Sequence, residues 1–138
     1  MQKILIVVDM QNDFIDGALG TPEAVAIVPR VEQKIREFPG KVIFTRDTHG
    51  ERYLETQEGK HLPVPHCIKG TKGWEICLQL EALREAEAID KVTFGSEKLG
   101  ELLQEENRKE QIEDITLVGL CTDICVISNA LLLKAFLP

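Results

Sequence analysis

Two uninterrupted apolar runs constrain the fold of this 138-residue chain more than any other feature. The first run, ILIVV at 4–8, ends in Asp9, and the second, ITLV at 115–118, is followed by Gly119. Runs of this length without polar alternation are typical of strands buried on both faces, which occur mainly in parallel sheets. Helical patterns between the strands therefore predict a three-layer α/β/α sandwich around a mostly parallel, doubly wound sheet.

Strand and helix patterns alternate along the rest of the chain. Further strands are predicted at 41–46 and 88–92, and helices at 21–38, 73–86, 97–108 and 122–136. The segment 47–72 has few apolar residues and contains all three histidines, so we expect a long ordered loop with a functional role. No repeat or domain boundary interrupts the pattern, which predicts one domain over 1–138.

Charge and hydropathy limit the partners of the protein. The formal net charge is -7 and no basic block is present, which argues against a nucleic-acid partner or an anionic membrane surface. No apolar run is long enough to cross a bilayer and no leader precedes the first strand, so we expect a cytoplasmic protein whose four cysteines are reduced. The apolar segment 131–137 needs cover, which self-association into a homo-oligomer would supply.

Three residues with complementary chemistry follow three of the predicted strands: Asp9, Lys91 and Cys125. The carboxyl ends of parallel strands meet at one edge of a sheet, where these side chains could gather. The carboxylate would then take the thiol proton, and the ammonium would stabilise the resulting anions. Cys125 also falls in the first turn of the last predicted helix, which favours a thiolate, and nearby backbone N–H groups could hold an oxyanion. The alternative is that Cys125 is a buried packing residue and Lys91 an ordinary surface lysine.

A second group of residues has the chemistry of a metal site. Asp47 and His49 lie where the strand at 41–46 ends, and Glu58 and His66 lie on the following loop. Imidazoles combined with carboxylates suit zinc, manganese or iron, whereas calcium avoids imidazole. His61 competes with Glu58 for one position, and spacing does not decide between them.

Five segments of this chain match a known family in the family's order: LIVVDMQNDF at 5–14, TRDTH at 45–49, LPVPHCIKGTKGWE at 62–75, DKVTFGS at 90–96 and VGLCTDICVISNA at 118–130. They cover nearly the whole chain, and the last is highly specific. The chain resembles the isochorismatase-like cysteine hydrolases and, within them, the nicotinamidases.

This resemblance implies a catalytic triad of Asp9, Lys91 and Cys125. It also implies that the peptide before Cys121 is cis and that the backbone N–H groups of Cys121 and Cys125 form an oxyanion hole. A cis bond without proline is strained, as expected at a position shaped for function. By the same resemblance, Phe14 lines the substrate pocket.

The resemblance further implies a bound divalent metal ion that contacts the pyridine nitrogen of the substrate. Its ligands would be Asp47, His49, His66 and, as our choice for the fourth, Glu58. The chain departs from the pattern at 62–65, where many nicotinamidases have an aromatic residue that stacks on the substrate ring. Family members also usually continue past Pro138 with a further strand and helix, so a C-terminal truncation is one expectation.

We therefore expect a metal-dependent cysteine amidohydrolase that converts nicotinamide, or a similar small linear carboxamide, to the acid and ammonia through a thioester. Zinc is the preferred cofactor, with manganese and iron as alternatives, and the expected partner is a small-molecule amide. Other readings remain open: an amidohydrolase for a carbamoyl compound, an isochorismatase, an inactive α/β binding module, or a dithiol switch at Cys121 and Cys125.

Overall fold

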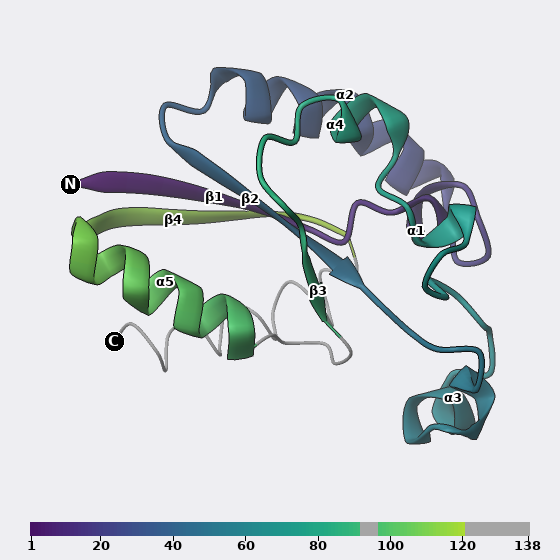
Figure 1. Cartoon of the computed structure of the whole chain (residues 1–138). Coiled ribbons are helices and arrows are strands. Elements are labelled where there is room, and N and C mark those ends of the chain that lie inside the picture. The colour runs from purple at the N-terminus through teal and green to yellow at the C-terminus, as the bar shows by residue number, and fades with distance from the viewer. Residues whose placement is uncertain (92–96, 121–138) are drawn as a thin grey trace.

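A parallel four-stranded sheet lies at the centre of the computed structural model, which describes residues 1–91 and 97–120. Within these residues the strands are β1 (Gln2–Val8), β2 (Lys41–Asp47), β3 (Ile89–Lys91) and β4 (Ile112–Gly119). Their order across the sheet is β3-β2-β1-β4, and each neighbouring pair is parallel. The predicted parallel sheet is therefore confirmed (Figure 1).

Helices cover both faces of this sheet. The described helices are α1 (Asn12–Ile15), α2 (Pro22–Glu37), α3 (Gln57–His61), α4 (Leu78–Glu81) and α5 (Glu97–Lys109), with 3₁₀ turns η1 (Tyr53–Glu55) and η2 (Lys72–Trp74). Figure 1 shows α2 and α4 on one face and α5 on the other, as the three-layer prediction requires. Among the described helices, none is long and apolar enough to cross a membrane.

The side chains of β1 alternate between two hydrophobic cores, one on each face. Leu5 and Val7 join the cluster formed with α2 and α4, whereas Ile4, Ile6 and Val8 join the cluster formed with α5. All five are fully buried. Burial on both faces explains why the sequence of this strand contains no polar alternation.

Helix α2 begins and ends at local signals that are visible in the sequence. The Thr21 side chain accepts a hydrogen bond from the Ala24 N–H at 3.0 Å, and Pro22 occupies the first turn, where its missing N–H costs nothing. The helix ends before Pro39, which disfavours a helical conformation at Phe38. The helix predicted from 21 to about 38 is thus confirmed.

The helix predicted within 73–86 is present only in part, as the short helix α4. This segment contains only η2 and α4, which are separated by extended backbone. The Cys77 N–H donates to the Met10 carbonyl at 3.0 Å, and Ile76 forms an antiparallel bridge with Gln11. These long-range contacts use backbone groups that a continuous helix would use internally. The short helix α3 lies in the segment 47–72, which the sequence predicts to be a loop, and the short helix α1 was not predicted.

Gly119 allows β4 to approach β1 closely at the carboxyl edge of the sheet. Its φ is +142°, and a Cβ placed there would lie 2.1 Å from the Val8 carbonyl oxygen. Gly119 pairs with Val8, and the following Leu120 N–H donates to the same carbonyl at 3.2 Å. A residue with a side chain cannot occupy this position without separating the two strands.

We predict that Gly119→Ala lowers the free energy of unfolding by about 2 kcal/mol or more, because the added methyl clashes with backbone and the φ is unfavourable. Urea denaturation measures the effect. Gly50→Ala is the matched control, since a Cβ there would meet no atom within 4 Å and its φ is not positive. Equal stability of the two variants would contradict the prediction.

Candidate active site and metal centre

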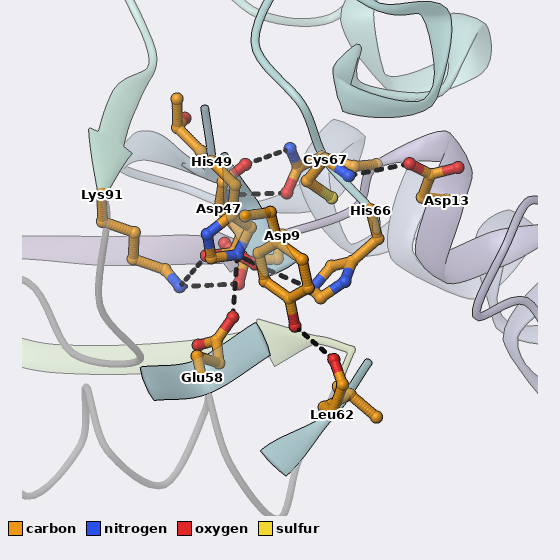
Figure 2. A network of polar contacts seen from close by, with 12 residues as sticks. Asp9, Asp13, Asp47, His49, Glu58, Leu62, His66, Cys67 and Lys91 are labelled. Atoms are coloured by element: carbon orange, nitrogen blue, oxygen red, sulfur yellow. Dashed lines mark hydrogen bonds and ion pairs between the residues drawn. The ribbon is translucent and has the colours of Figure 1, made fainter. Parts of the chain in front are cut away.

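Charged side chains from three strands gather at the carboxyl edge of the sheet. Asp9 follows β1, Asp47 ends β2 and Lys91 ends β3. Asp47 and Lys91 are partners in the register of the β2–β3 pair. The sheet topology thus brings together residues that lie far apart in the sequence, and Figure 2 shows the resulting polar network.

Asp9 and Lys91 form a buried ion pair. The distance between Lys91 Nζ and Asp9 Oδ2 is 2.7 Å, and the Thr45 hydroxyl donates to Asp9 Oδ1 at 2.8 Å. Asp9 is fully buried and Lys91 is 3% exposed, so each charge depends on the other for compensation. Asp9 has a φ of +51°, in the left-handed region, which costs roughly 1–2 kcal/mol for a residue with a side chain. Such strain is characteristic of functional positions.

Lys91 is held in place by contacts between β2 and β3, although β3 has only three residues. The Arg46 guanidinium donates two hydrogen bonds to the Asp90 carboxylate, at 2.6 and 3.2 Å, and stacks on the Trp74 ring at 4.1 Å from its centroid. The Thr48 N–H donates to the Lys91 carbonyl at 2.8 Å. These contacts direct the Lys91 ammonium towards Asp9 and, at 4.0 Å, towards Asp47 Oδ1.

Asp47 belongs to the predicted metal group, and the structure also places its carboxylate beside Lys91 of the predicted catalytic group. Its Oδ2 lies 2.9 Å from His49 Nε2 and 3.5 Å from His66 Nε2. Burial disfavours the charged form, but hydrogen bonds from His49 and His66 and the charge of Lys91 outweigh burial and lower the pKa of Asp47 to about 2. The carboxylate therefore stays ionised at neutral pH.

The His66 ring is oriented by a backbone carbonyl. Its Nδ1 lies 2.7 Å from the Val64 carbonyl oxygen, which can only accept, so Nδ1 carries a proton and Nε2 faces Asp47. Burial would lower the pKa of His66, but the hydrogen bonds to Asp47 and to the Val64 carbonyl prevail and raise it above its usual value. Phe14 packs against this imidazole edge to face, with ring centroids 5.4 Å apart.

Helix α3 brings Glu58 to the same cluster. The Thr56 side chain caps this helix by accepting from the Gly59 N–H at 3.0 Å. Glu58, in the first turn, then places its Oε2 at 3.0 Å from His49 Nε2. His61 lies on the same helix with its side chain exposed. Of these two alternatives, the structure therefore brings Glu58, and not His61, to the other three residues.

Four side chains offer ligand atoms that all lie within 4.8 Å of one another: Asp47, His49, Glu58 and His66. Two buried oxygens of this cluster, Asp47 Oδ1 and Glu58 Oε2, accept no hydrogen bond from the described residues. Their nearest charged or ring nitrogens are Lys91 Nζ, at 4.0 Å from Asp47 Oδ1, and His49 Nε2, at 3.0 Å from Glu58 Oε2. Buried carboxylate oxygens without a well-formed hydrogen bond favour a cation beside them. Two imidazoles and two carboxylates form a donor set that suits zinc, manganese or iron, so the residues fit a divalent metal ion.

Two further residues support this cluster and were not identified from the sequence. The Asp13 carboxylate accepts the Cys67 N–H at 2.8 Å, beside His66. The buried Tyr53 ring packs edge to face against His49 and His66, at 4.7 and 5.0 Å between centroids. Burial, with the charges of nearby carboxylates, raises the pKa of Tyr53 to about 12. Asp13 acts across 54 residues of sequence, so no local pattern indicates its partner, whereas Tyr53 lies close to His49 in the sequence but meets His66 only through the fold of the intervening segment.

The predicted nucleophile Cys125 and the Cys121 peptide lie outside the described residues, as do the cis bond and the oxyanion hole. Their roles stay predictions. The described chain reaches Leu120, whose N–H is bonded to Val8, the residue before Asp9.

The chain belongs to the isochorismatase family, because the family model for the isochorismatase domain matches residues 3–136. A curated relative, the nicotinamidase/pyrazinamidase of Mycobacterium tuberculosis, is 27% identical over 93% of this chain and 76% of its own length. The family predicted from the sequence motifs is therefore confirmed.

Solved structures of similar fold include two enzymes that are named for different activities. The pyrazinamidase of Pyrococcus horikoshii in complex with zinc is 29% identical, with a TM-score of 0.76 over 99% of this chain and 80% of that one. The N-carbamoylsarcosine amidase of Thermoplasma acidophilum is 30% identical, with a TM-score of 0.73 over 95% of this chain and 75% of that one.

We predict that the stability of the metal-free protein falls on both sides of a slightly acidic optimum. The folded state raises the pKa of His66, so its contribution is complete below the usual 6.5 and is lost as pH rises through the folded value. Asp47 has a folded pKa of about 2 against the usual 3.8, so its contribution, about 2 kcal/mol, is lost as pH falls below about 4.

Urea denaturation in the presence of a chelator, repeated over a series of pH values, measures the loss of stability at both high and low pH. In the variant His66→Gln, the free energy of unfolding should depend less on pH above 6.5 than it does in the wild type. A wild-type stability that does not decline there would contradict the assignment to His66.

Proposed function

We propose that this protein hydrolyses a small linear carboxamide, with nicotinamide as the first choice of substrate. The observation that carries the proposal is the juxtaposition, at one sheet edge, of the buried Asp9–Lys91 pair and the cluster around Asp47. Membership of the isochorismatase family and similarity to a nicotinamidase/pyrazinamidase support it.

In the proposed mechanism, Asp9 accepts the proton of the Cys125 thiol, and the thiolate attacks the carbonyl carbon of the amide. The N–H groups of Cys121 and Cys125 hold the oxyanion. Lys91, 2.7 Å from Asp9, keeps the Asp9 carboxylate ionised before this transfer and offsets the thiolate charge after it.

Asp9 then returns the proton to the nitrogen as the carbon–nitrogen bond breaks, which releases ammonia and leaves a thioester on Cys125. In the second half-reaction Asp9 deprotonates water, the hydroxide attacks the thioester, and the acid leaves as the thiol is restored. The sum is amide plus water to acid plus ammonia. The four side chains of the Asp47 cluster would hold a divalent ion, which supplies a Lewis-acidic contact for a ring nitrogen of the substrate.

We predict that the purified protein releases ammonia from nicotinamide and that Cys125→Ala lowers kcat/KM by at least about 10³-fold, because the substitution removes the sulfur on which the acyl intermediate forms. An enzyme-coupled ammonia assay measures both. The control is Cys77→Ala, which removes a cysteine packed in the core beneath α2. Amidase activity that survives in Cys125→Ala would exclude the mechanism.

A carbamoyl compound is the second candidate substrate. The similarity to an N-carbamoylsarcosine amidase, at 30% identity, favours it. Parallel assays with nicotinamide and N-carbamoylsarcosine separate the two hypotheses, because each hypothesis predicts the higher kcat/KM for the substrate that it names. Failure of both, together with a Cys125 that does not react with iodoacetamide, would leave the binding-module hypothesis.

We predict that Glu58→Ala weakens zinc binding by at least about 10–100-fold, the range for residues that only orient a ligand, whereas His61→Ala leaves it unchanged. Both substitutions fall on α3, but the structure brings only Glu58, of the two, to the cluster. Competition with a chromogenic chelator measures the affinity without reference to activity. The reverse order of effects would show that His61 is the ligand.

A further inference from the structure

Gln11 lies two residues after Asp9, and its side chain is fully buried. Both the nitrogen and the oxygen of its amide form hydrogen bonds to the last residue of β2, Asp47. Its Nε2 donates to the Asp47 carbonyl and its Oε1 accepts the Asp47 N–H, each at 2.8 Å. The second Nε2 proton goes to the Trp74 carbonyl, also at 2.8 Å. Both donors and the acceptor of this amide are therefore used.

This arrangement replaces a missing strand partner. The backbone pairing between β1 and β2 runs to Val8 and Thr45, and the Asp9 N–H makes the last contact, to the Thr45 carbonyl at 3.2 Å. The positive φ of Asp9 then turns the chain away from β2. Backbone groups of a strand alternate between its two neighbours, so Asp47, two residues after Thr45, directs its N–H and carbonyl towards the place that β1 has left.

Without a partner, these two buried backbone groups would lose their hydrogen bonds at a cost of about 1–3 kcal/mol each. The primary amide of Gln11 has the same donor and acceptor as a peptide group, and it continues the ladder for one residue beyond the end of β1. On the other side of β2, Lys91 of β3 is the register partner of Asp47, and its carbonyl accepts the N–H of the next residue, Thr48, at 2.8 Å. Gln11 therefore holds the Asp47 backbone groups directly, and β3 holds the residue that follows.

We propose that Gln11 is a positioning residue for the metal centre, acting through the backbone of Asp47. The inference rests on the proposed role of Asp47 as a metal ligand. The Asp47 carboxylate faces His49, His66 and Lys91 within 4.0 Å, so a small rotation of its backbone changes every one of these distances. Holding both backbone groups prevents that rotation, and it also ties the carboxylate to the segment that begins with Asp9.

The test is the zinc affinity of Gln11→Met, measured by competition with a chromogenic chelator on the full chain. Methionine has a similar length but cannot donate to the Asp47 carbonyl or accept from its N–H. We expect affinity to fall by about 10–100-fold, the range typical of residues that orient metal ligands. Gln11→Glu, which keeps an acceptor but loses both donors, should also bind zinc more weakly, and it serves if Gln11→Met does not fold.

Two controls separate positioning from a general loss of stability. Asn12→Ala removes the neighbouring amide, which donates to the Lys72 carbonyl at 2.8 Å and does not contact Asp47. Val31→Ala creates a cavity in the core beneath α2, remote from the metal cluster in sequence and packing. Both should bind zinc with wild-type affinity even where thermal stability falls.

The outcomes are distinct. Wild-type affinity in the Gln11 variants would overturn the positioning role while leaving the proposed metal centre intact. A loss of affinity in Val31→Ala as large as that in Gln11→Met would also overturn it, because affinity would then follow stability. A wild-type protein that binds no zinc would overturn the metal centre itself and, with it, this inference.

Discussion

The arrangement of the polar sheet edge depends on one buried cation, the Lys91 ammonium. It lies 2.7 Å from the Asp9 carboxylate and 4.0 Å from that of Asp47, and all three side chains are nearly inaccessible to solvent. Two carboxylates buried this close without a cation would repel each other, and the pKa of at least one would rise. The shared lysine removes this conflict, and it links the acid–base group of the proposed mechanism to the metal cluster.

Much of the fold could be predicted because its signals are local. Runs of apolar and β-branched residues indicate β1 and β4, and the residues that follow parallel strands must meet at one edge, which is why Asp9 and Lys91 could be grouped from the sequence. The sequence predicts Asp47 only as a metal ligand, and its place beside Lys91 comes from the structure. The capped and proline-bounded α2 was equally clear. These predictions needed the order of residues along the chain and the geometry of a parallel sheet, and nothing more.

The remaining features depend on contacts between distant segments. The region 73–86 has helical spacing, yet the Met10 carbonyl and Gln11 hold its middle in an extended form. The choice between Glu58 and His61 depends on where α3 begins, which the Thr56 cap determines. Gln11 gave no signal, because an amide two residues after a strand has many uses until its partner is known. Tertiary hydrogen bonds override local preference in each case.

The backbone around His49 has a consequence for the variability of the site. The His49 N–H donates to the Cys67 carbonyl, and the Lys69 N–H donates to the His49 carbonyl, each at 2.9 Å. These bonds hold the two ends of the segment 50–66 close together. Closing a longer loop costs little additional entropy once its ends are joined. The segment can therefore change in length while the His49 backbone stays in place, provided that Glu58 and His66 still reach the metal cluster. Insertions or deletions in this segment would therefore alter the surroundings of the metal cluster without disturbing the sheet.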